Sequence, residues 1–303
     1  MIQPVNFSFN AETAVNNAFQ VAGAGDQTQA QDLALAEFEG FVQRLRDNGV
    51  DVTVVQDTPN PYTPDSIFPN NWVSFHDDGT VCLYPMYAVN RRQERKPGVL
   101  QTVSERFTIS DTIDLTGYEK DNHFLEGTGS MVLDREHKIA YACLSPRTDG
   151  QVLLDFCRQL GYTAELFTAV DGNGHAIYHT NVMMCVADRY IVVCLAALPM
   201  EKEREHLMAT ISATGKTIVP ITLDQMNHFA GNMLQVHNQQ GERLLIMSTQ
   251  AYHSLTPTQV RQLEDFNRIL HAPLTTIETN GGGSARCMLA EIHLPKTTTG
   301  SPA

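Results

Sequence analysis

Three residues of this chain have the types that a thiol-based catalyst needs. Cys287 follows the glycine run 281–283, His179 lies in the segment 178–181, and Glu126 lies in a Leu-Glu-Gly segment. A cysteine supplies a nucleophile, a histidine carries protons, and a carboxylate orients the imidazole ring. The three residues are far apart in sequence, so the fold must bring them together before they can act.

Length and composition indicate a globular protein with a large core. The chain has 303 residues, 42% of them hydrophobic, and a net charge of −13. The excess of acidic residues argues against nucleic acids and anionic membranes as partners. Residues 1–10 lack the features of a signal peptide, and no apolar run reaches the roughly 18 residues of a membrane span. We therefore expect a cytoplasmic protein.

Six cysteines occur in the chain and none belongs to a Cys-x-x-Cys pair, so we expect reduced thiols. Cys287 differs from the others because glycines precede it and Arg286 flanks it. The other five lie within apolar runs and are expected in the core: Cys82, Cys143, Cys157, Cys185 and Cys194.

No motif of the chain predicts a metal or a cofactor. His175 and His179 are four residues apart, as in a helical zinc pair, but residues 171–174 predict a turn and no Glu follows His175. The glycine run 281–283 lacks the Lys-Ser/Thr pair of a phosphate-binding loop. We predict that the protein works without either group.

Five segments of the chain share one layout. In each, a small or polar residue leads into an apolar run, a polar turn and a second apolar run, the last being residues 284–294. Equivalent positions recur at spacings of 56, 52, 52 and 56 residues, and they are Asn71, Gly127, His179, Gly231 and Cys287. Such a period is the signature of repeated structural units.

Helical segments lie between the predicted hairpins, and a short β-rich strand follows each helix. The predicted unit is therefore strand–strand–helix–strand, used five times in one α/β domain over residues 1–303. An ordinary α/β protein whose hairpins are alike by chance is the alternative. The predicted helices are 31–48, 150–160, 202–213 and 256–270, and the predicted strands after helices include 52–55 and 217–221.

A radial arrangement of such units brings equivalent strand ends close to one axis. Polar residues at these ends then become neighbours, and buried polar groups need partners, so their convergence indicates a site. The residues that this arrangement gathers are Asn70, Asn71, Glu126, His179, Asn181 and Cys287.

The motifs of the chain resemble those of the guanidino-group-modifying superfamily. It includes arginine deiminase, dimethylarginine hydrolase and the amidinotransferases, and its fold is the five-bladed α/β-propeller called the pentein. The resemblance covers nearly all five repeats. It is strongest in segments 64–71, 125–127, 145–148, 179–181 and 282–288, in the order that the superfamily has them.

The resemblance implies a role for each site residue. Cys287 would be the nucleophile, His179 the general acid and base, and Glu126 the carboxylate that positions the imidazole or the substrate. Arg147 would grip the α-carboxylate of an amino acid. A second arginine would come from Arg91, Arg92 or Arg95, and we assign Arg92. The other implied substrate contacts are Asp65, Phe68, Asn70, Asn71 and Asn181.

Asparagines stand where deiminases and dimethylarginine hydrolases usually have aspartates. They are Asn70 and Asn71 on one segment and Asn181 after the histidine. An amide donates and accepts hydrogen bonds, whereas a carboxylate only accepts. A ureido group has a carbonyl oxygen that needs a hydrogen-bond donor. Amide side chains therefore suit a ureido group better than they suit a cationic guanidinium, which would lose its counter-charge. The pattern resembles the citrulline-utilisation hydrolases and predicts that citrulline yields ornithine, ammonia and CO2.

Other functions stay open at this point. An arginine deiminase, a dimethylarginine hydrolase or an amidinotransferase would use the same three catalytic groups on a guanidino amino acid. A non-enzymatic pentein that binds a ribosome is the second alternative, although a charge of −13 suits RNA poorly. The sequence is compatible with a monomer and with a homo-oligomer.

Overall fold

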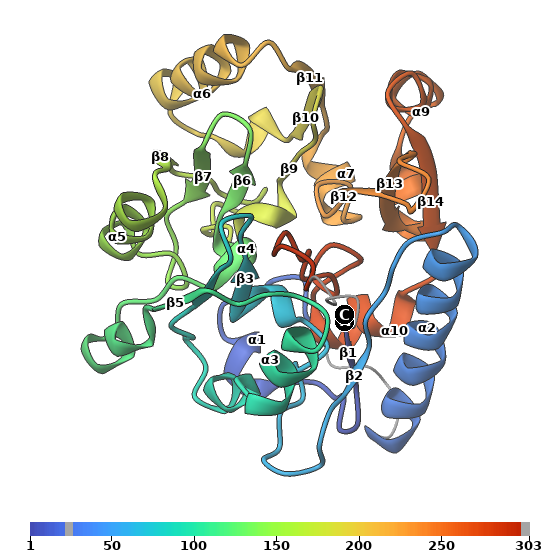
Figure 1. The fold of residues 1–303 in the computed structure, drawn as a ribbon. Helices are drawn as coiled ribbons and strands as arrows, with labels where there is room; N and C mark the ends of the chain where they lie inside the picture. Colours follow the sequence, from blue (N-terminus) through green and yellow to red (C-terminus); the bar gives the residue numbers. More distant parts are fainter. Residues whose placement is uncertain (22–26, 298–303) are drawn as a thin grey trace, which may run out of the picture.

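The computed structural model describes residues 1–21 and 27–297 and has a mixed α/β fold (Figure 1). The remaining positions of the predicted domain, 22–26 and 298–303, lie outside the described residues. Among the described residues, no helix is long and apolar enough to cross a membrane.

Four three-stranded sheets share one pattern. Two antiparallel strands form a hairpin, and a third strand pairs in parallel with the second. In Figure 1 these sheets follow one another around the middle of the molecule. Their strands are β3 (Val73–Phe75), β4 (Thr80–Leu83) and β5 (Asp111–Asp114); β6 (Val132–Asp134), β7 (Ile139–Cys143) and β8 (Thr163–Phe167); β9 (Met184–Val186), β10 (Tyr190–Val193) and β11 (Thr217–Pro220); and β12 (Leu234–His237), β13 (Arg243–Ser248) and β14 (Arg268–Ala272).

Helices connect the second strand of each sheet to the third, as parallel pairing requires. These connecting helices are α3 (Pro97–Ser104), α5 (Gly150–Leu160), α6 (Glu201–Ala213), and α8 (Thr249–Ser254) with α9 (Pro257–Glu264). The other helices are α1 (Ala11–Ala14), α2 (Gln27–Asp47), α4 (Gly127–Ser130), α7 (Leu223–Asn227) and α10 (Thr275–Gly281).

Helix α5 shows how the sequence sets these elements. The Asp149 side chain accepts hydrogen bonds from two backbone N–H groups of the first turn, and Gly161 ends the helix with a φ of 71°. The apolar side chains between these caps recur at helical spacing and form one buried face. That face consists of Val152, Leu153, Phe156 and Cys157.

Two sequence predictions of elements are wrong. The helix predicted over 256–270 ends at Glu264, because residues 268–272 pair with β13 as strand β14. The fifth predicted hairpin, 284–294, contains no strand, since its first residues form the turns that carry Cys287. In its place, the described part of the chain has a two-stranded parallel sheet of β1 (Ile2–Gln3) and β2 (Val55–Gln56).

The turns that lead into successive hairpins contact one another at the middle of the molecule. Gly127 and Gly231 permit this approach, because a Cβ atom at either position would lie 2.4 Å or 2.2 Å from a backbone oxygen of the preceding turn. Hydrogen bonds link the turns in order: Thr128 Oγ1 donates to Asn70 O (3.2 Å), Thr180 Oγ1 to Ser130 O (2.6 Å), Asn232 Nδ2 to Asn181 O (3.0 Å) and the Arg286 N–H to Asn232 Oδ1 (3.1 Å).

Candidate active site

A narrow cavity lies where these turns meet, and its volume is only about 10 Å³, close to that of a single water molecule. Cys287 and His179 both line it, although their positions differ by more than a hundred in the sequence. The full lining is Thr13, Asn17, Asp65, Phe68, Asn71, Arg91, Arg147, Tyr178, His179, Gly281, Gly282, Gly283 and Cys287.

The glycine run places Cys287 at the cavity wall. Gly282 has a φ of 65°, and a Cβ atom at Gly281 or Gly283 would lie 2.8 or 2.9 Å from the ring of Phe68. The hydroxyl of Tyr178 donates to the Gly282 carbonyl (2.6 Å) and fixes the run from the opposite side. Only 3% of the Cys287 residue is exposed.

Two side-chain amides donate hydrogen bonds to the sulfur of Cys287. Asn232 Nδ2 lies 3.2 Å from Sγ, and Asn181 Nδ2 lies 3.5 Å from it. Hydrogen bonds of this kind stabilise a thiolate more than a neutral thiol, because the charge on sulfur strengthens them. The surroundings of the sulfur thus favour a nucleophilic role.

His179 and Glu126 form a buried pair. The Nε2 atom of His179 lies 2.8 Å from Oε2 of Glu126, and the Tyr87 N–H donates to the other carboxylate oxygen (3.0 Å). Burial by itself would raise the pKa of Glu126, but Arg147, His179 and Arg91 outweigh it and hold that pKa well below its usual value. Glu126 is therefore ionised.

An ionised Glu126 accepts hydrogen bonds only, so Nε2 of His179 carries the proton and Nδ1 carries the lone pair. Nδ1 lies on the side of Gly129, where a Cβ atom would be 2.8 Å from it. Burial, with Arg147 and Arg91, lowers the pKa of His179 to about 4 despite Glu126. Among the described residues no hydrogen bond joins His179 to Cys287, although both side chains line the same cavity.

Asp65 presents a carboxylate with one free oxygen to the same cavity. Its Oδ2 accepts from Asn10 Nδ2 (2.7 Å) and Thr13 Oγ1 (3.2 Å), whereas its buried Oδ1 has no hydrogen-bond partner in the described structure. Burial raises the pKa of Asp65, and Arg91 opposes that rise. A donor from a bound molecule would satisfy the free oxygen.

Arg91 also lines the cavity and is buried in a network of hydrogen bonds. It donates to both carboxylate oxygens of Glu94 (2.8 and 3.0 Å) and to Oδ1 of Asn71 (2.9 Å). This last bond fixes the amide of Asn71, so that its Nδ2 is on the opposite side, donating to Asn70 Oδ1 (3.2 Å). The network sets the orientation of an amide that lines the cavity.

The N-terminal segment, of which residues 10–21 are described, covers the cavity and contributes Thr13 and Asn17 to its lining. Arg147 donates to Oδ1 of Asn16 through Nε (2.8 Å) and Nη2 (2.5 Å), and to the Thr13 carbonyl (2.7 Å). The guanidinium also stacks over the ring of Tyr178 at 5.0 Å. The described part of the segment, through residue 21, therefore occupies the donors of the arginine predicted to grip a carboxylate.

Three predicted substrate residues lie outside the cavity lining, namely Arg92, Asn70 and Asn181, although Asn181 contacts the sulfur of Cys287. Arg92 donates to Met86 O (3.0 Å) and faces a separate open groove near Glu119. Successive residues of the 3-10 helix Asn90–Glu94 point about 120° apart, so the helix turns Arg91 inward and Arg92 outward. This corrects the assignment of Arg92 to the site. Asn70 likewise faces Thr128 and Asn71.

Sequence reasoning missed Asn232, Tyr178 and Asn16 as site residues. Asn232 follows Gly231, one of the five repeat positions, so the repeat itself contained a signal for it. Tyr178 directly precedes His179 in a motif that was already recognised. Asn16 carried no such signal, because its contact with Arg147 spans 131 positions.

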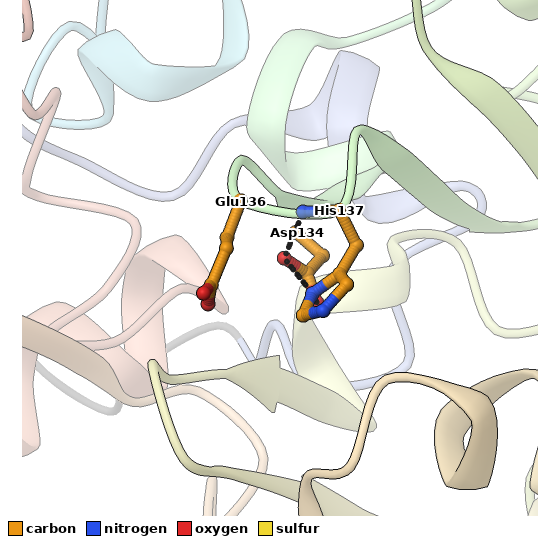
Figure 2. Close-up of side chains that lie close together, drawn as sticks. All are labelled: Asp134, Glu136 and His137. Carbon is orange, nitrogen blue, oxygen red and sulfur yellow. Dashed lines mark hydrogen bonds and ion pairs between the residues drawn. The ribbon is translucent and has the colours of Figure 1, made fainter.

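One cluster outside the cavity has side chains of the types that bind metals. Figure 2 shows Asp134, Glu136 and His137 at the turn between β6 and β7. The ammonium group of Lys216 lies 3.5 Å from Asp134 and 3.4 Å from Glu136, and it also donates to two backbone carbonyls. A cation of the protein thus balances these carboxylates already, and the cluster is an ion-pair network in which Asp134 is buried and Glu136 is exposed.

Comparison with known families identifies the chain. The model of the family described as N,N dimethylarginine dimethylhydrolase, eukaryotic, matches residues 3–294. The chain belongs to this family, which confirms the predicted superfamily. No curated protein sequence matches the chain.

Solved structures share the fold at low sequence identity. The N-terminal domain of ArgZ, an arginine dihydrolase from the ornithine–ammonia cycle in cyanobacteria, solved bound to product, has a TM-score of 0.74 and 18% identity, over 97% of this chain and 98% of that domain. Unliganded AgrE has a TM-score of 0.72 and 21% identity, over 95% of this chain and 38% of its own. The chain thus spans less than half of full-length AgrE. An adduct of dimethylarginine dimethylaminohydrolase has a TM-score of 0.60 and 12% identity, over 95% and 96%.

Proposed function

We propose that the protein is a cysteine-dependent hydrolase of the ureido group of citrulline or a related amino acid. The observation that carries this proposal is the set of amides at the reacting end of the cavity. Asn181 donates to the sulfur of Cys287, and Asn71 lines the wall beside His179. The nearby carboxylate of Glu126 is already paired with His179 and Arg147. A neutral head group needs no further counter-charge there.

The other end of the cavity suits a zwitterionic amino acid. The free oxygen of Asp65 is an acceptor for an α-ammonium group, and Arg147 is a bidentate donor for an α-carboxylate. Arg147 reaches such a carboxylate only after Asn16 gives up its two hydrogen bonds. The N-terminal segment therefore moves when substrate binds in this account.

The proposed reaction uses Cys287 and His179 in turn. His179 Nδ1 takes the proton of the Cys287 thiol, and the thiolate attacks the ureido carbon. Amide donors stabilise the charge that gathers on the oxygen. The histidine then protonates the departing δ-amino group, which leaves ornithine and an S-carbamoyl cysteine. Water, activated by His179, cleaves the thioester bond and gives carbamic acid, which decomposes to ammonia and CO2.

A guanidino amino acid is the alternative substrate, and two observations favour it. Asp65 brings a carboxylate to the cavity, and ArgZ and AgrE have been solved with substrate or arginine bound. The same residues would then perform the chemistry of an arginine deiminase or dimethylarginine hydrolase. An amidinotransferase would need a second amine in the cavity, and a non-enzymatic pentein would need none of the three catalytic groups.

The proposal extends to architecture and location. We propose that the protein is a five-bladed pentein propeller in a single catalytic domain over residues 1–303, and the repeated pattern of the four three-stranded sheets supports this. All six cysteines are free and buried, which suits a reducing cytoplasm. The partner is a small ureido or guanidino amino acid, with no nucleic acid, membrane or cofactor, and a homo-oligomer stays a prediction.

A substrate panel tests this function. Ammonia release is measured with citrulline, arginine and N,N-dimethylarginine, using the Cys287→Ala protein as the blank. We expect citrulline to be turned over with the highest kcat/KM and the blank to be inactive. Rapid arginine turnover with inert citrulline would replace the ureido proposal by the guanidino alternative. Equal ammonia release by the blank would end the cysteine mechanism.

A further inference from the structure

Asn232 is the polar residue that lies nearest the sulfur of Cys287 among the hydrogen-bond partners described above. It is fully buried, and its Nδ2 is 3.2 Å from Sγ. The same nitrogen donates to the Asn181 carbonyl (3.0 Å), and Oδ1 accepts from the Arg286 N–H (3.1 Å). Both N–H groups of the amide and one lone pair of its oxygen are therefore engaged in hydrogen bonds within the protein.

These partners allow only one orientation of the amide. A flip would place Oδ1 against the carbonyl oxygen of Asn181 and would point the NH2 group at the Arg286 N–H. Both contacts would be unfavourable, because like groups would face each other. Gly231 permits the close approach that makes this bonding possible, since a Cβ atom there would be 2.2 Å from the Val182 carbonyl oxygen.

Asn181 contacts the same sulfur in a different way. Its Nδ2 is 3.5 Å from Sγ, and its buried Oδ1 has no hydrogen-bond partner in the described structure. Asn181 thus keeps an acceptor free for the N–H of a bound molecule, whereas the amide oxygen of Asn232 is already engaged. Of the two asparagines at this sulfur atom, Asn181 can therefore also accept a hydrogen bond from a bound molecule, whereas Asn232 contacts only the protein.

We propose that Asn232 is a catalytic residue that donates a permanent hydrogen bond to the sulfur of Cys287 and stabilises its thiolate at both ends of the reaction cycle. The inference rests on the proposed function. When the carbon–sulfur bond forms, the sulfur gives up an electron pair. When hydrolysis breaks that bond, the pair returns to sulfur, and the proton returns through His179. The fixed donor at 3.2 Å stabilises the thiolate in addition to the imidazolium that forms when His179 takes the thiol proton.

Alkylation of Cys287 by iodoacetamide, followed by peptide mass spectrometry, tests the donor without any substrate. We expect Asn232→Ala to react at least about tenfold more slowly than the wild type near pH 7, as loss of one hydrogen bond to a charged group implies. At higher pH the difference between the two rates should narrow, because more of the thiol is ionised in both proteins. Asn232→Asp keeps the shape, puts an acceptor against the sulfur and serves if the alanine variant fails to fold.

Asn267→Ala is the matched control, because Asn267 is a buried asparagine that binds Tyr190 and Gln235 away from the cavity. It should react like the wild type at both pH values. Wild-type rates for the Asn232 variants at neutral pH, or an equal slowing at both pH values, would overturn the proposal. A wild type inactive on every ureido and guanidino compound would refute the proposed function while this alkylation test still decides the role of Asn232.

Discussion

Asn71 is the residue on which the choice between a neutral and a cationic head group depends most. It lines the cavity, and Arg91 fixes its amide. We expect Asn71→Asp to lower kcat/KM for citrulline by about tenfold or more, since a donor-capable amide becomes an acceptor-only carboxylate. The same change should shift the ratio of activities toward arginine.

The neighbouring residue provides the control for this prediction. Asn70→Asp introduces the same charge, but Asn70 faces Thr128 instead of the cavity. Its ratio of citrulline to arginine activity should stay that of the wild type. An unchanged ratio in Asn71→Asp, measured on folded protein, contradicts the assignment of Asn71 to the head group.

His179 makes the stability of the protein depend on pH. Its folded pKa is lowered to about 4, whereas the unfolded value is 6.5. Between these values the unfolded chain binds a proton and the folded chain does not, so stability falls as pH falls. From pH 7 to pH 5 the free energy of unfolding should fall in both proteins. We expect the fall in His179→Gln to be smaller than that in the wild type by about 2 kcal/mol.

Urea unfolding at the two pH values measures this difference. His76 serves as an internal reference, because burial lowers its pKa to about 3 and it remains in both proteins. Identical pH dependence in wild type and His179→Gln would mean that folding does not lower the pKa of His179, which would contradict this prediction.

At the scale of elements, helix α4 sets the position of the imidazole. A Cβ atom at Gly129 would lie 2.4 Å from Asn71 Nδ2 and 2.8 Å from His179 Nδ1. Gly129→Ala must therefore displace one of these two side chains, and we expect kcat to fall by about a hundredfold. Steady-state kinetics measures the effect.

Gly150→Ala is the control for that change. Gly150 is the first residue of α5, and a Cβ atom there would make only ordinary contacts at 3.5 Å or more. Its activity should equal that of the wild type. Full activity in Gly129→Ala would show that the position of His179 tolerates movement that the mechanism forbids.

The sequence predicted elements well where the signal is local. Apolar runs around a polar turn marked four of the hairpins, and the helix predicted over 150–160 coincides with α5. The strand at 268–272 was taken as helix, because its pairing with β13 is a long-range contact. The residues before Cys287 resemble the start of a strand but form turns, since the glycine run must pass Phe68 closely.

For the whole molecule, the repeat predicted which distant residues meet. Its five positions lie in turns that contact one another in order, and this explains why Cys287, His179 and Glu126 share one site. The repeat could not predict which of two adjacent arginines turns inward. It also could not predict that Asn16 covers Arg147, because nothing local to either residue encodes that contact.

The central claim is that the thiol of Cys287 forms a covalent bond to the carbon of a ureido group. Mass spectrometry of enzyme quenched rapidly after mixing with citrulline tests this most directly, with the Cys287→Ala protein beside it. The account predicts one carbamoyl group on the peptide that contains Cys287 and none on the variant. Ornithine release without any adduct on that peptide, or undiminished release by Cys287→Ala, would contradict it.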